Sequence, residues 1–164
     1  MLSDTHGFIH QMIVEHLADS DVVIHAGDIG SSQVLRTLKT ITKHDYAVRG
    51  NNDTFDKWGN RDVKTLNALP DSVQLDLKTF RICVNHGHMF NPAYLRHQCL
   101  RKAFTSANLV VYGHSHRLII DQAQSPCIVN PGSAGKTRTF GGASCLLIAF
   151  EKNDFSVVAF RVQN

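Results

Sequence analysis

The 164-residue chain lacks the features that define several protein classes. Its longest apolar stretches fall well short of a membrane span, and no charged-then-apolar signal segment opens it. We therefore expect no membrane partner and predict a cytoplasmic location. The net charge is only +3, and no basic stripe interleaves with aromatic residues. A specific nucleic-acid groove is therefore not indicated.

The chain also has few cysteines, and their spacing forms no recognisable motif. Cys83, Cys99, Cys127 and Cys145 are scattered, with no C-x-x-C pair. Reduced thiols are expected rather than a disulfide framework or a zinc knuckle. No internal repeat, low-complexity tract or linker divides the sequence. Residues 1–164 are therefore expected to form a single domain with a substantial core.

Apolar, β-branched runs alternate with helical periodicity, which predicts an α/β fold. Helices are expected over 9–17, over 34–41, and from the Asn91-Pro92 pair to about residue 104. The segment 54–70 has weak periodicity and is predicted to be a loop. The expected strands cover residues 22–25, 46–48, 72–78, 79–85, 109–112, 117–121, 126–129, 144–150 and 155–162.

Five short polar clusters, each directly after an apolar run, supply oxygen and imidazole groups. They are Asp4-Thr5-His6, Gly27-Asp28, Gly50-Asn51-Asn52-Asp53, His86-Gly87-His88 and Gly113-His114-Ser115-His116. Each candidate ligand thus lies at the C-terminal end of a predicted strand, where ligand sites gather in open α/β sheets. The D-x-H and H-x-H spacings place both side chains of each pair on the same side of an extended backbone.

The candidate metal ligands are Asp4, His6, Asp28, Asn51, His86, His114 and His116. They are too many for one tetrahedral ion, but with a bridging Asp28 they provide two ions with four protein ligands each. A single D-x-H motif is commonplace, so only the whole set favours metal binding over structural histidines. Mixed oxygen and nitrogen donors suit transition metals better than Ca²⁺ or Mg²⁺. We therefore expect two divalent transition-metal ions per chain, Mn²⁺ first, with Fe, Zn, Ni or Co as alternatives.

The order D-x-H, G-D, G-N-x-D, H-G-H and G-H-x-H resembles the calcineurin-like metallophosphoesterase superfamily. Asn130-Pro131-Gly132-Ser133, which follows, narrows the resemblance to its small single-domain branch, the YfcE-like phosphodiesterases. The resemblance runs from Ser3 to about residue 162. It implies an α/β fold of four layers, α/β/β/α, in which two mixed sheets are flanked by helices.

The resemblance also assigns the ligands. Asp4, His6 and His116 would hold one ion, Asn51, His86 and His114 would hold the other, and Asp28 would bridge the two. Asn51, His86 and His114 would also be the catalytic residues, with Asn51 orienting a phosphate oxygen. The implied activity is that of a dinuclear metal-dependent phosphodiesterase or phosphoesterase. It would hydrolyse small phosphate esters by in-line attack of a hydroxide that bridges the two metal ions.

Two features depart from the pattern of this family. A strand of several residues normally precedes S-D-T-H-G, whereas only Met1, Leu2 and Ser3 stand there in this sequence. We therefore expect an unusually short first strand or a fuller chain. Many relatives carry histidine directly after the metal-binding asparagine, where it can protonate the leaving group. This chain has Asn52, and a neutral amide cannot act as that acid, so esters with poor leaving groups are expected to react slowly.

Non-enzymatic functions stay open. The alternative is a non-catalytic protein-interaction scaffold, because the retromer subunit of the vacuolar sorting class resembles this branch and keeps its late motifs. In that relative the bridging aspartate and the metal-binding asparagine are altered, whereas Asp28 and Asn51 are intact here. A metal-dependent sensing protein is a third reading. The sequence does not decide the physiological substrate or whether the protein forms a homo-oligomer.

Other polar residues receive weaker predictions. His25 is expected to be packed and hydrogen-bonded within its strand, and His88 to be structural, with a substrate contact as the alternative. Trp58 either lines the substrate cleft or covers the core. The remaining histidines and the loop cations are expected to be surface groups without a specific role: His10, His16, His44, His97, Lys136 and Arg138.

Overall fold

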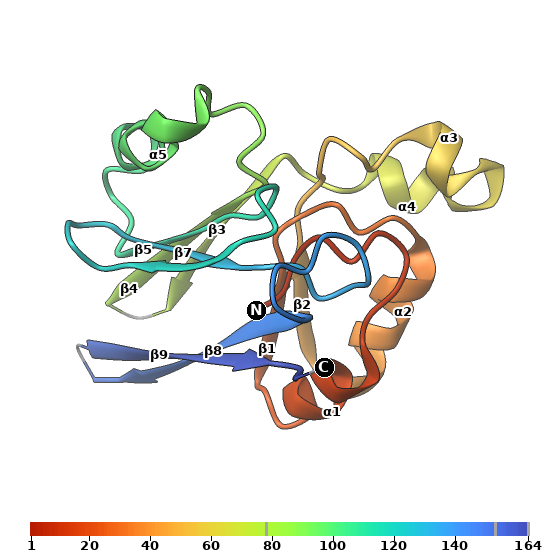
Figure 1. The fold of residues 1–164 in the computed structure, drawn as a ribbon, viewed down its shortest axis with the longest axis horizontal. Helices are drawn as coiled ribbons and strands as arrows, with labels where there is room; N and C mark the ends of the chain where they lie inside the picture. The colour runs from red at the N-terminus through yellow and green to blue at the C-terminus, as the bar shows by residue number, and fades with distance from the viewer. Residues whose placement is uncertain (78, 153, 164) are drawn as a thin grey trace.

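The computed structural model of the protein, drawn in Figure 1, describes residues 1–77, 79–152 and 154–163. In chain order its elements, with 3₁₀ helices written η, are α1 (Gln11–Leu17), β1 (Val22–His25), α2 (Ser32–Ile41), β2 (His44–Ala47), α3 (Phe55–Trp58), η1 (Asn60–Asp62), α4 (Val63–Asn67), β3 (Ser72–Leu77), β4 (Phe80–Asn85), η2 (Ala93–Leu95), α5 (Arg96–Ala103), β5 (Leu109–Val111), β6 (Leu118–Asp121), β7 (Cys127–Pro131), β8 (Ser144–Glu151) and β9 (Asp154–Arg161). Lys78, the last residue of the strand expected over 72–78, lies outside the described residues.

Residues 1 and 2 join two strand pairs into one sheet. β1 pairs with β2 in parallel, and β8 pairs with β9 in antiparallel fashion. Leu2 forms a parallel bridge to His25 in β1. Met1 exchanges two backbone hydrogen bonds, of 2.6 and 2.9 Å, with Leu146 in β8. The order across this sheet is therefore β2, β1, residues 1–2, β8 and β9, and the paired segment before Asp4 is short.

The second sheet has five strands in the order β3-β4-β5-β7-β6. Its three central strands run parallel, and the edge strands β3 and β6 are antiparallel to their neighbours. Parallel strands are covered on both faces, so their sequences are apolar runs rather than alternations. In β5, for example, Leu109, Val110 and Val111 are all fully buried.

Hydrophobic cores lie on both faces of each sheet. Because side chains alternate along a strand, Ile24 points into the core between the sheets, whereas its neighbour Val23 packs with residues of α1 and α2. In the same way Val111 faces the inter-sheet core, and Val110 packs with Leu100 of α5. Figure 1 shows α5 outside the five-stranded sheet and α1 and α2 beside the other sheet. The expected α/β/β/α fold is therefore confirmed.

The segment 54–70, expected to be a loop, contains α3, η1 and α4. The longest of these has five residues, so helical periodicity extends over too few turns to be recognised in the sequence. Packing stabilises the segment, because Trp58 and Leu66 are buried in a cluster with Ile29 and Val34. Trp58 is only 6% exposed and belongs to this core.

The helix predicted to begin at Asn91-Pro92 begins later. Pro92 has an extended ψ of 162°, η2 follows it, and α5 covers only Arg96–Ala103. The Asn91 side chain does not cap a helix, because its Nδ2 donates a hydrogen bond to His88 O at 2.8 Å. Within the described part of the chain, no helix has both the length and the hydrophobicity required to cross a membrane.

Candidate metal centre

The structure brings the seven predicted ligand residues together at the carboxyl ends of strands from both sheets. Asp4 and His6 follow the paired residues 1–2, Asp28 follows β1, Asn51 follows β2, His86 follows β4, and His114 and His116 follow β5. Both sheets thus contribute to the centre, which agrees with the usual place of ligand sites in α/β folds.

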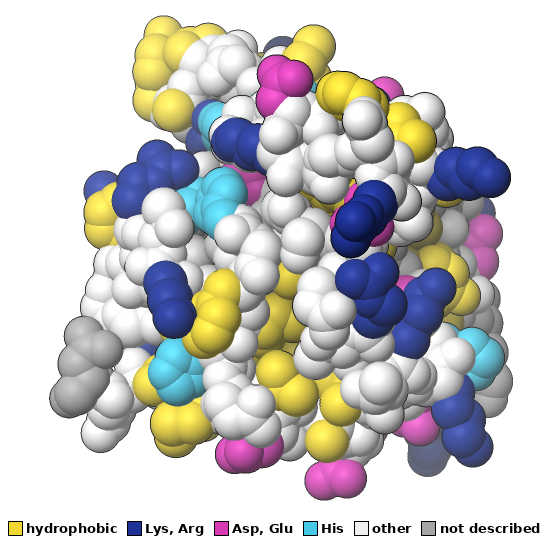
Figure 2. Space-filling view, turned by 90° about the vertical axis from the view of Figure 1, so that its right-hand side faces the viewer, with side chains coloured by type: hydrophobic (Ala, Val, Ile, Leu, Met, Phe, Trp, Pro, Cys, Tyr) yellow, Lys and Arg dark blue, Asp and Glu magenta, His cyan; other side chains and the backbone are white. Residues whose placement is uncertain are grey.

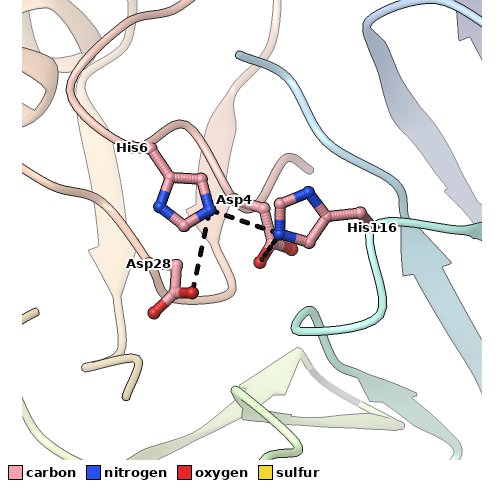
Figure 3. A group of neighbouring side chains, drawn as sticks. All are labelled: Asp4, His6, Asp28 and His116. Carbon is pink, nitrogen blue, oxygen red and sulfur yellow. Dashed lines mark hydrogen bonds and ion pairs between the residues drawn. The ribbon is translucent and has the colours of Figure 1, made fainter. Parts of the chain in front are cut away.

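Asp4, His6, Asp28 and His116 form a first group (Figure 3). Each offers one ligand atom, and the four atoms all lie within 4.8 Å of one another. His116 Nε2 lies 3.2 Å from both His6 Nε2 and Asp4 Oδ1. His6 Nε2 lies 3.8 Å from Asp28 Oδ2. Three of these residues are buried, and His6 is partly exposed.

Asn51, His86 and His114 form a second group on the other side of the Asp28 carboxylate. Asn51 Oδ1 lies 3.2 Å from His86 Nε2 and 3.0 Å from His114 Nδ1. His86 Nε2 is also 3.3 Å from Asp28 Oδ1. One carboxylate oxygen of Asp28 therefore approaches each group, which is the arrangement that a bridging ligand requires.

Hydrogen bonds behind two of the rings show which nitrogen faces the centre. A backbone carbonyl can only accept, so His116 Nδ1 donates to Thr137 O at 2.8 Å. His86 Nδ1 likewise donates to Ala26 O at 2.8 Å. Both rings therefore turn Nε2 toward the carboxylates. Metal-ligating histidines are commonly oriented by such a bond from their other nitrogen.

This convergence of acceptors calls for a cation. Ring nitrogens and carboxylate oxygens that face each other in a buried site repel unless a proton or a cation lies between them. The hydrogen bond to Asp28 and the charges of Asp4 and Asp28 raise the pKa of His86 although burial opposes this. At His116, Arg138 Nη2 donates to Nε2 at 2.9 Å. The donor set therefore fits divalent ions that accept both nitrogen and oxygen ligands.

The two carboxylates of the centre differ in charge state. Burial raises the pKa of Asp4 to about 7, and the charge of His86 and the hydrogen bond from Ser3 only partly offset it. Burial acts in the same direction on Asp28. The hydrogen bond and charge of His86 and two hydrogen bonds from Asn52 outweigh it and place the pKa of Asp28 well below its ordinary range. Asp28 is therefore an anion at neutral pH, and a cation beside Asp4 would favour the charged form there too.

The backbone is strained where the ligands lie. Among non-glycine residues with positive φ in the described structure are five of the seven candidates: Asp4, His6, Asp28, His114 and His116, with φ between 48° and 65°. Such conformations cost free energy and concentrate at functional sites. Glycine permits the close approach of the strands' ends. A Cβ at Gly27, where φ is +91°, would lie only 2.6 Å from His86 Nδ1.

The N-P-G-S turn holds the ligand loops from behind. Asn130 Nδ2 donates to Gly113 O at 2.7 Å and to Ser115 Oγ at 3.0 Å. Ser133 Oγ donates to Asp4 O at 2.8 Å. The motif identified from the sequence thus positions the backbone on which Asp4, His114 and His116 stand.

Asp53, the last residue of the G-N-x-D motif, is a buried positioning residue to which the sequence assigned no role. Its carboxylate accepts hydrogen bonds from Ile29 N at 3.2 Å, from Gly30 N and Gly50 N at 2.8 Å each, and from Trp58 Nε1 at 3.1 Å. These donors belong to the loop after Asp28, to the turn that carries Asn51, and to α3. One carboxylate therefore ties together the segments on both sides of the centre.

Replacing Asp53 with asparagine is expected to lower the free energy of unfolding by about 3 kcal/mol, because an amide removes the charge and turns a donor toward backbone N–H groups. Trp58→Phe is the matched control, since it removes a single donor and part of one core side chain. It should cost about 1–2 kcal/mol. Urea unfolding of the metal-free proteins measures both. If Asp53→Asn lowered the free energy of unfolding by no more than Trp58→Phe does, the carboxylate would not hold the loops.

His25 is packed and hydrogen-bonded, as predicted. It is fully buried, its Nδ1 accepts from Gly27 N at 3.2 Å, and its Nε2 lies 2.9 Å from Thr5 Oγ1. Thr5 Oγ1 donates onward to Ile29 O at 2.8 Å, so the ring N–H at Nε2 has an acceptor. Burial and the nearby charge of His86 lower the pKa of His25 to about 3. The folded protein thus keeps this ring neutral.

This neutral ring predicts acid sensitivity. In the unfolded chain His25 binds a proton below about pH 6.5, whereas in the folded chain it does so only near about pH 3. Between these values the unfolded state binds more protons, so the contribution of His25 to stability is lost as pH falls. Without metal, unfolding free energies measured from about pH 7 to about pH 4 should decrease less steeply in His25→Gln than in wild type. Equal pH slopes would contradict the prediction.

Three other polar residues make contacts that the sequence did not predict. Asn52 contacts Asp28 twice, since its backbone N and its Nδ2 donate to the two carboxylate oxygens at 2.8 Å each. His97, expected at the surface, is only partly exposed, and its ring nitrogens lie 2.6 Å from Asp121 Oδ2 and 3.0 Å from Tyr112 Oη. Arg138, expected to have no specific role, contacts His116.

His88 lies beside the second group. Its ring centroid is 5.5 Å from that of His86 and 6.2 Å from that of His114. Its Nδ1 is buried without a hydrogen-bond partner among the described residues. Burial and the charge of His86 lower its pKa. The structure therefore places His88 against the centre and leaves both of its predicted roles open.

Comparison with known proteins agrees with this geometry. Residues 1–153 match the model of the calcineurin-like phosphoesterase superfamily domain, so the chain belongs to that superfamily. A phosphodiesterase of Methanocaldococcus jannaschii is 26% identical over 143 residues, which cover 80% of this chain and 81% of the relative.

Several solved structures share the fold, including the following two. One is wild-type Vps29 of Entamoeba histolytica complexed with zinc, which has a TM-score of 0.75 and 18% identity over 98% of this chain and 96% of the other. The second is a novel archaeal phosphodiesterase, with a TM-score of 0.69 and 22% identity over 97% of both chains. The structural likeness thus extends to a phosphodiesterase and to a protein of the vacuolar sorting class.

Proposed function

We propose that this protein is a metal-dependent phosphodiesterase that hydrolyses small phosphate esters at a dinuclear centre. The observation that carries the proposal is the position of Asp28, whose two carboxylate oxygens approach separate groups of ligand side chains. Membership of the phosphoesterase superfamily and the likeness to a named phosphodiesterase support the same class of reaction.

The two groups of side chains would each hold one ion. Asp4, His6 and His116 would bind the first ion, Asn51, His86 and His114 the second, and Asp28 both. Bound there, two divalent ions would supply a hydroxide nucleophile at neutral pH and neutralise charge on the phosphate oxygens. Imidazole and carboxylate donors favour Mn²⁺ or another transition ion over Mg²⁺.

The side chains themselves orient the reactants. Thr137 O and Ala26 O fix the rings of His116 and His86, so that these ligands lose little freedom on binding. Asn52 donates to both oxygens of Asp28 and, together with the hydrogen bond and charge of His86, keeps that carboxylate charged. Asn52 itself has no proton to give to a leaving group. Efficient substrates are therefore diesters whose leaving group departs as a weak base.

A non-catalytic scaffold is the second candidate, because Vps29 of Entamoeba histolytica has the same fold. Identity to that structure is 18%, so the likeness shows the fold alone. The complete ligand set, including Asp28 and Asn51, favours the enzyme. Turnover separates the two candidates, since a scaffold would bind metal without hydrolysing any phosphate ester.

The test is a series of aryl phosphodiesters and alkyl phosphomonoesters given to protein reconstituted with Mn²⁺. We expect rapid cleavage of activated aryl diesters and slow cleavage of alkyl monoesters. Asn52→His would add a titratable group and should favour poor leaving groups by about 10-fold or more. This would flatten the dependence of log kcat on leaving-group pKa. No turnover of any ester by fully metal-loaded protein would reject the proposed function, and identical slopes would reject the role given to Asn52.

A further inference from the structure

Two cationic side chains from separate segments contact residues of the centre. Lys57, on α3, donates a hydrogen bond from Nζ to Asn52 Oδ1. Arg138, in the loop after the N-P-G-S turn, donates from Nη2 to His116 Nε2 at 2.9 Å. Asn52 in turn donates to Asp28, and Asp28 and His116 belong to the same group of ligand side chains. Both cations therefore lie beside the same part of the centre.

Both cations lie at the surface of the molecule. Figure 2 shows that several Lys and Arg side chains lie on the face that it draws. Lys57 and Arg138 are both exposed, so neither charge is enclosed in the core. Solvent alone would be the usual partner of such cations, but here each is held against a residue of the centre.

The backbone at Arg138 is left-handed. Its φ is +50°, a conformation that L-residues rarely adopt. The neighbouring Thr137 carbonyl accepts from His116 Nδ1, so two adjacent residues contact both nitrogens of one ring. Nε2 has a single lone pair, and an ion bound there would displace the guanidinium. Arg138 would then lie at the rim of the centre without that partner.

The charges of the centre can be balanced by a simple diester without Lys57 and Arg138. The seven candidate ligands include two carboxylates, Asp4 and Asp28. Two divalent ions would therefore leave two positive charges, which a hydroxide and a diester phosphate, with one negative charge each, would cancel. Lys57 and Arg138 add two further cations. A second anionic group on the substrate would offset the charge of these two cations.

We propose that Lys57 and Arg138 form a clamp for a second anionic group, so that the protein selects phosphodiesters with a negative charge beyond the scissile phosphate. This inference rests on the proposed function and names a substrate class for it. Guanidinium and ammonium groups bind carboxylate and phosphate through charge-assisted hydrogen bonds, and a guanidinium can do so with two at once.

A matched pair of substrates tests the clamp. 4-Nitrophenyl phenyl phosphate and 4-nitrophenyl 4-carboxyphenyl phosphate share a leaving group and differ by one charge. At saturating Mn²⁺, wild type should have about 10-fold higher kcat/KM for the carboxylated diester. Lys57→Met and Arg138→Met should each reduce that preference by about three- to fivefold, whereas Lys57→Arg and Arg138→Lys should keep most of it. Equal kcat/KM values for both diesters in wild type would overturn the clamp while leaving the phosphodiesterase intact.

Lys136→Met is the control for a general loss of charge. Lys136 lies in the same loop as Arg138, but its Nζ stacks over the Phe8 ring at 3.9 Å. The preference should survive in this variant, and an equal loss there would show that the clamp residues have no specific role.

A binding measurement tests the clamp independently of turnover. Calorimetry with methylphosphonate and 3-phosphonopropionate, on Mn²⁺-loaded protein, compares one anionic group with two. Wild type should bind 3-phosphonopropionate about 10-fold more tightly, and each Met variant should lose much of that difference. Equal affinities in wild type would reject the clamp. Failure to hydrolyse either diester, with the affinity difference present, would instead reject the proposed reaction.

Discussion

Replacing Asp28 with asparagine is expected to reduce kcat by about 10³-fold or more and to lower metal occupancy at both groups of ligands. A bridging carboxylate contributes negative charge to two cations, and an amide contributes neither that charge nor an equivalent bridge. The position of the Asp28 side chain explains why both groups of ligands should be affected. Its oxygens lie 3.8 Å from His6 Nε2 and 3.3 Å from His86 Nε2, and Asn52 donates to both.

The measurements are turnover of an activated aryl diester and metal content by elemental analysis after removal of free ions. Asp56→Asn is the control, because it makes the same chemical change at an exposed residue of α3. It should leave turnover and metal content near the wild-type values. Two ions per chain and near-normal turnover in Asp28→Asn would show that this carboxylate does not bridge.

Removing metal with a chelator is expected to abolish activity, by about 10³-fold or more, and added Mn²⁺ should restore it. Mg²⁺ should restore much less, since imidazole nitrogens fill part of each ligand set and Mg²⁺ prefers oxygen. Metal should also stabilise the fold, because ions that bind only the native state add about 2.7 kcal/mol when their concentration is 100 times Kd. Melting temperature then provides a readout that does not depend on turnover.

The variant His86→Ala tests the second group of ligands in the same experiment. Its loss should remove one donor of the second group and make both activity and melting temperature less responsive to Mn²⁺. Full activity of the wild type in excess chelator, or equal restoration by low concentrations of Mg²⁺, would contradict the proposed ligand set.

The fold class, and the convergence of the candidate residues at the ends of the strands, could be predicted because their signals are local. Short apolar runs such as Leu109–Val111 must be buried on both faces, and the polar residues directly after them must meet at the ends of the strands. The spacing of Asp4 and His6, and of His114 and His116, then places donors together. Which oxygen of Asp28 faces which histidine depends on loop conformation and could not be derived.

The parts that sequence reasoning missed depend on tertiary contacts. Residues 54–70 show no period because their helices are one turn long and are stabilised by burial of Trp58 and Leu66. Asp53 binds backbone N–H groups of a loop more than twenty residues away, and the sequence carries no mark of those donors. Nothing in the sequence distinguishes Arg138 from the other cations, and only the folding of its loop places it 2.9 Å from His116 Nε2. His97 is similarly paired with Asp121 only through the packing of α5.

Anomalous diffraction from crystals grown with Mn²⁺ tests the dinuclear centre most directly. We expect two peaks, one among Asp4, His6 and His116 and the other among Asn51, His86 and His114, with Asp28 in contact with both. A single peak, or two peaks that leave Asp28 uncoordinated, would contradict the proposed centre.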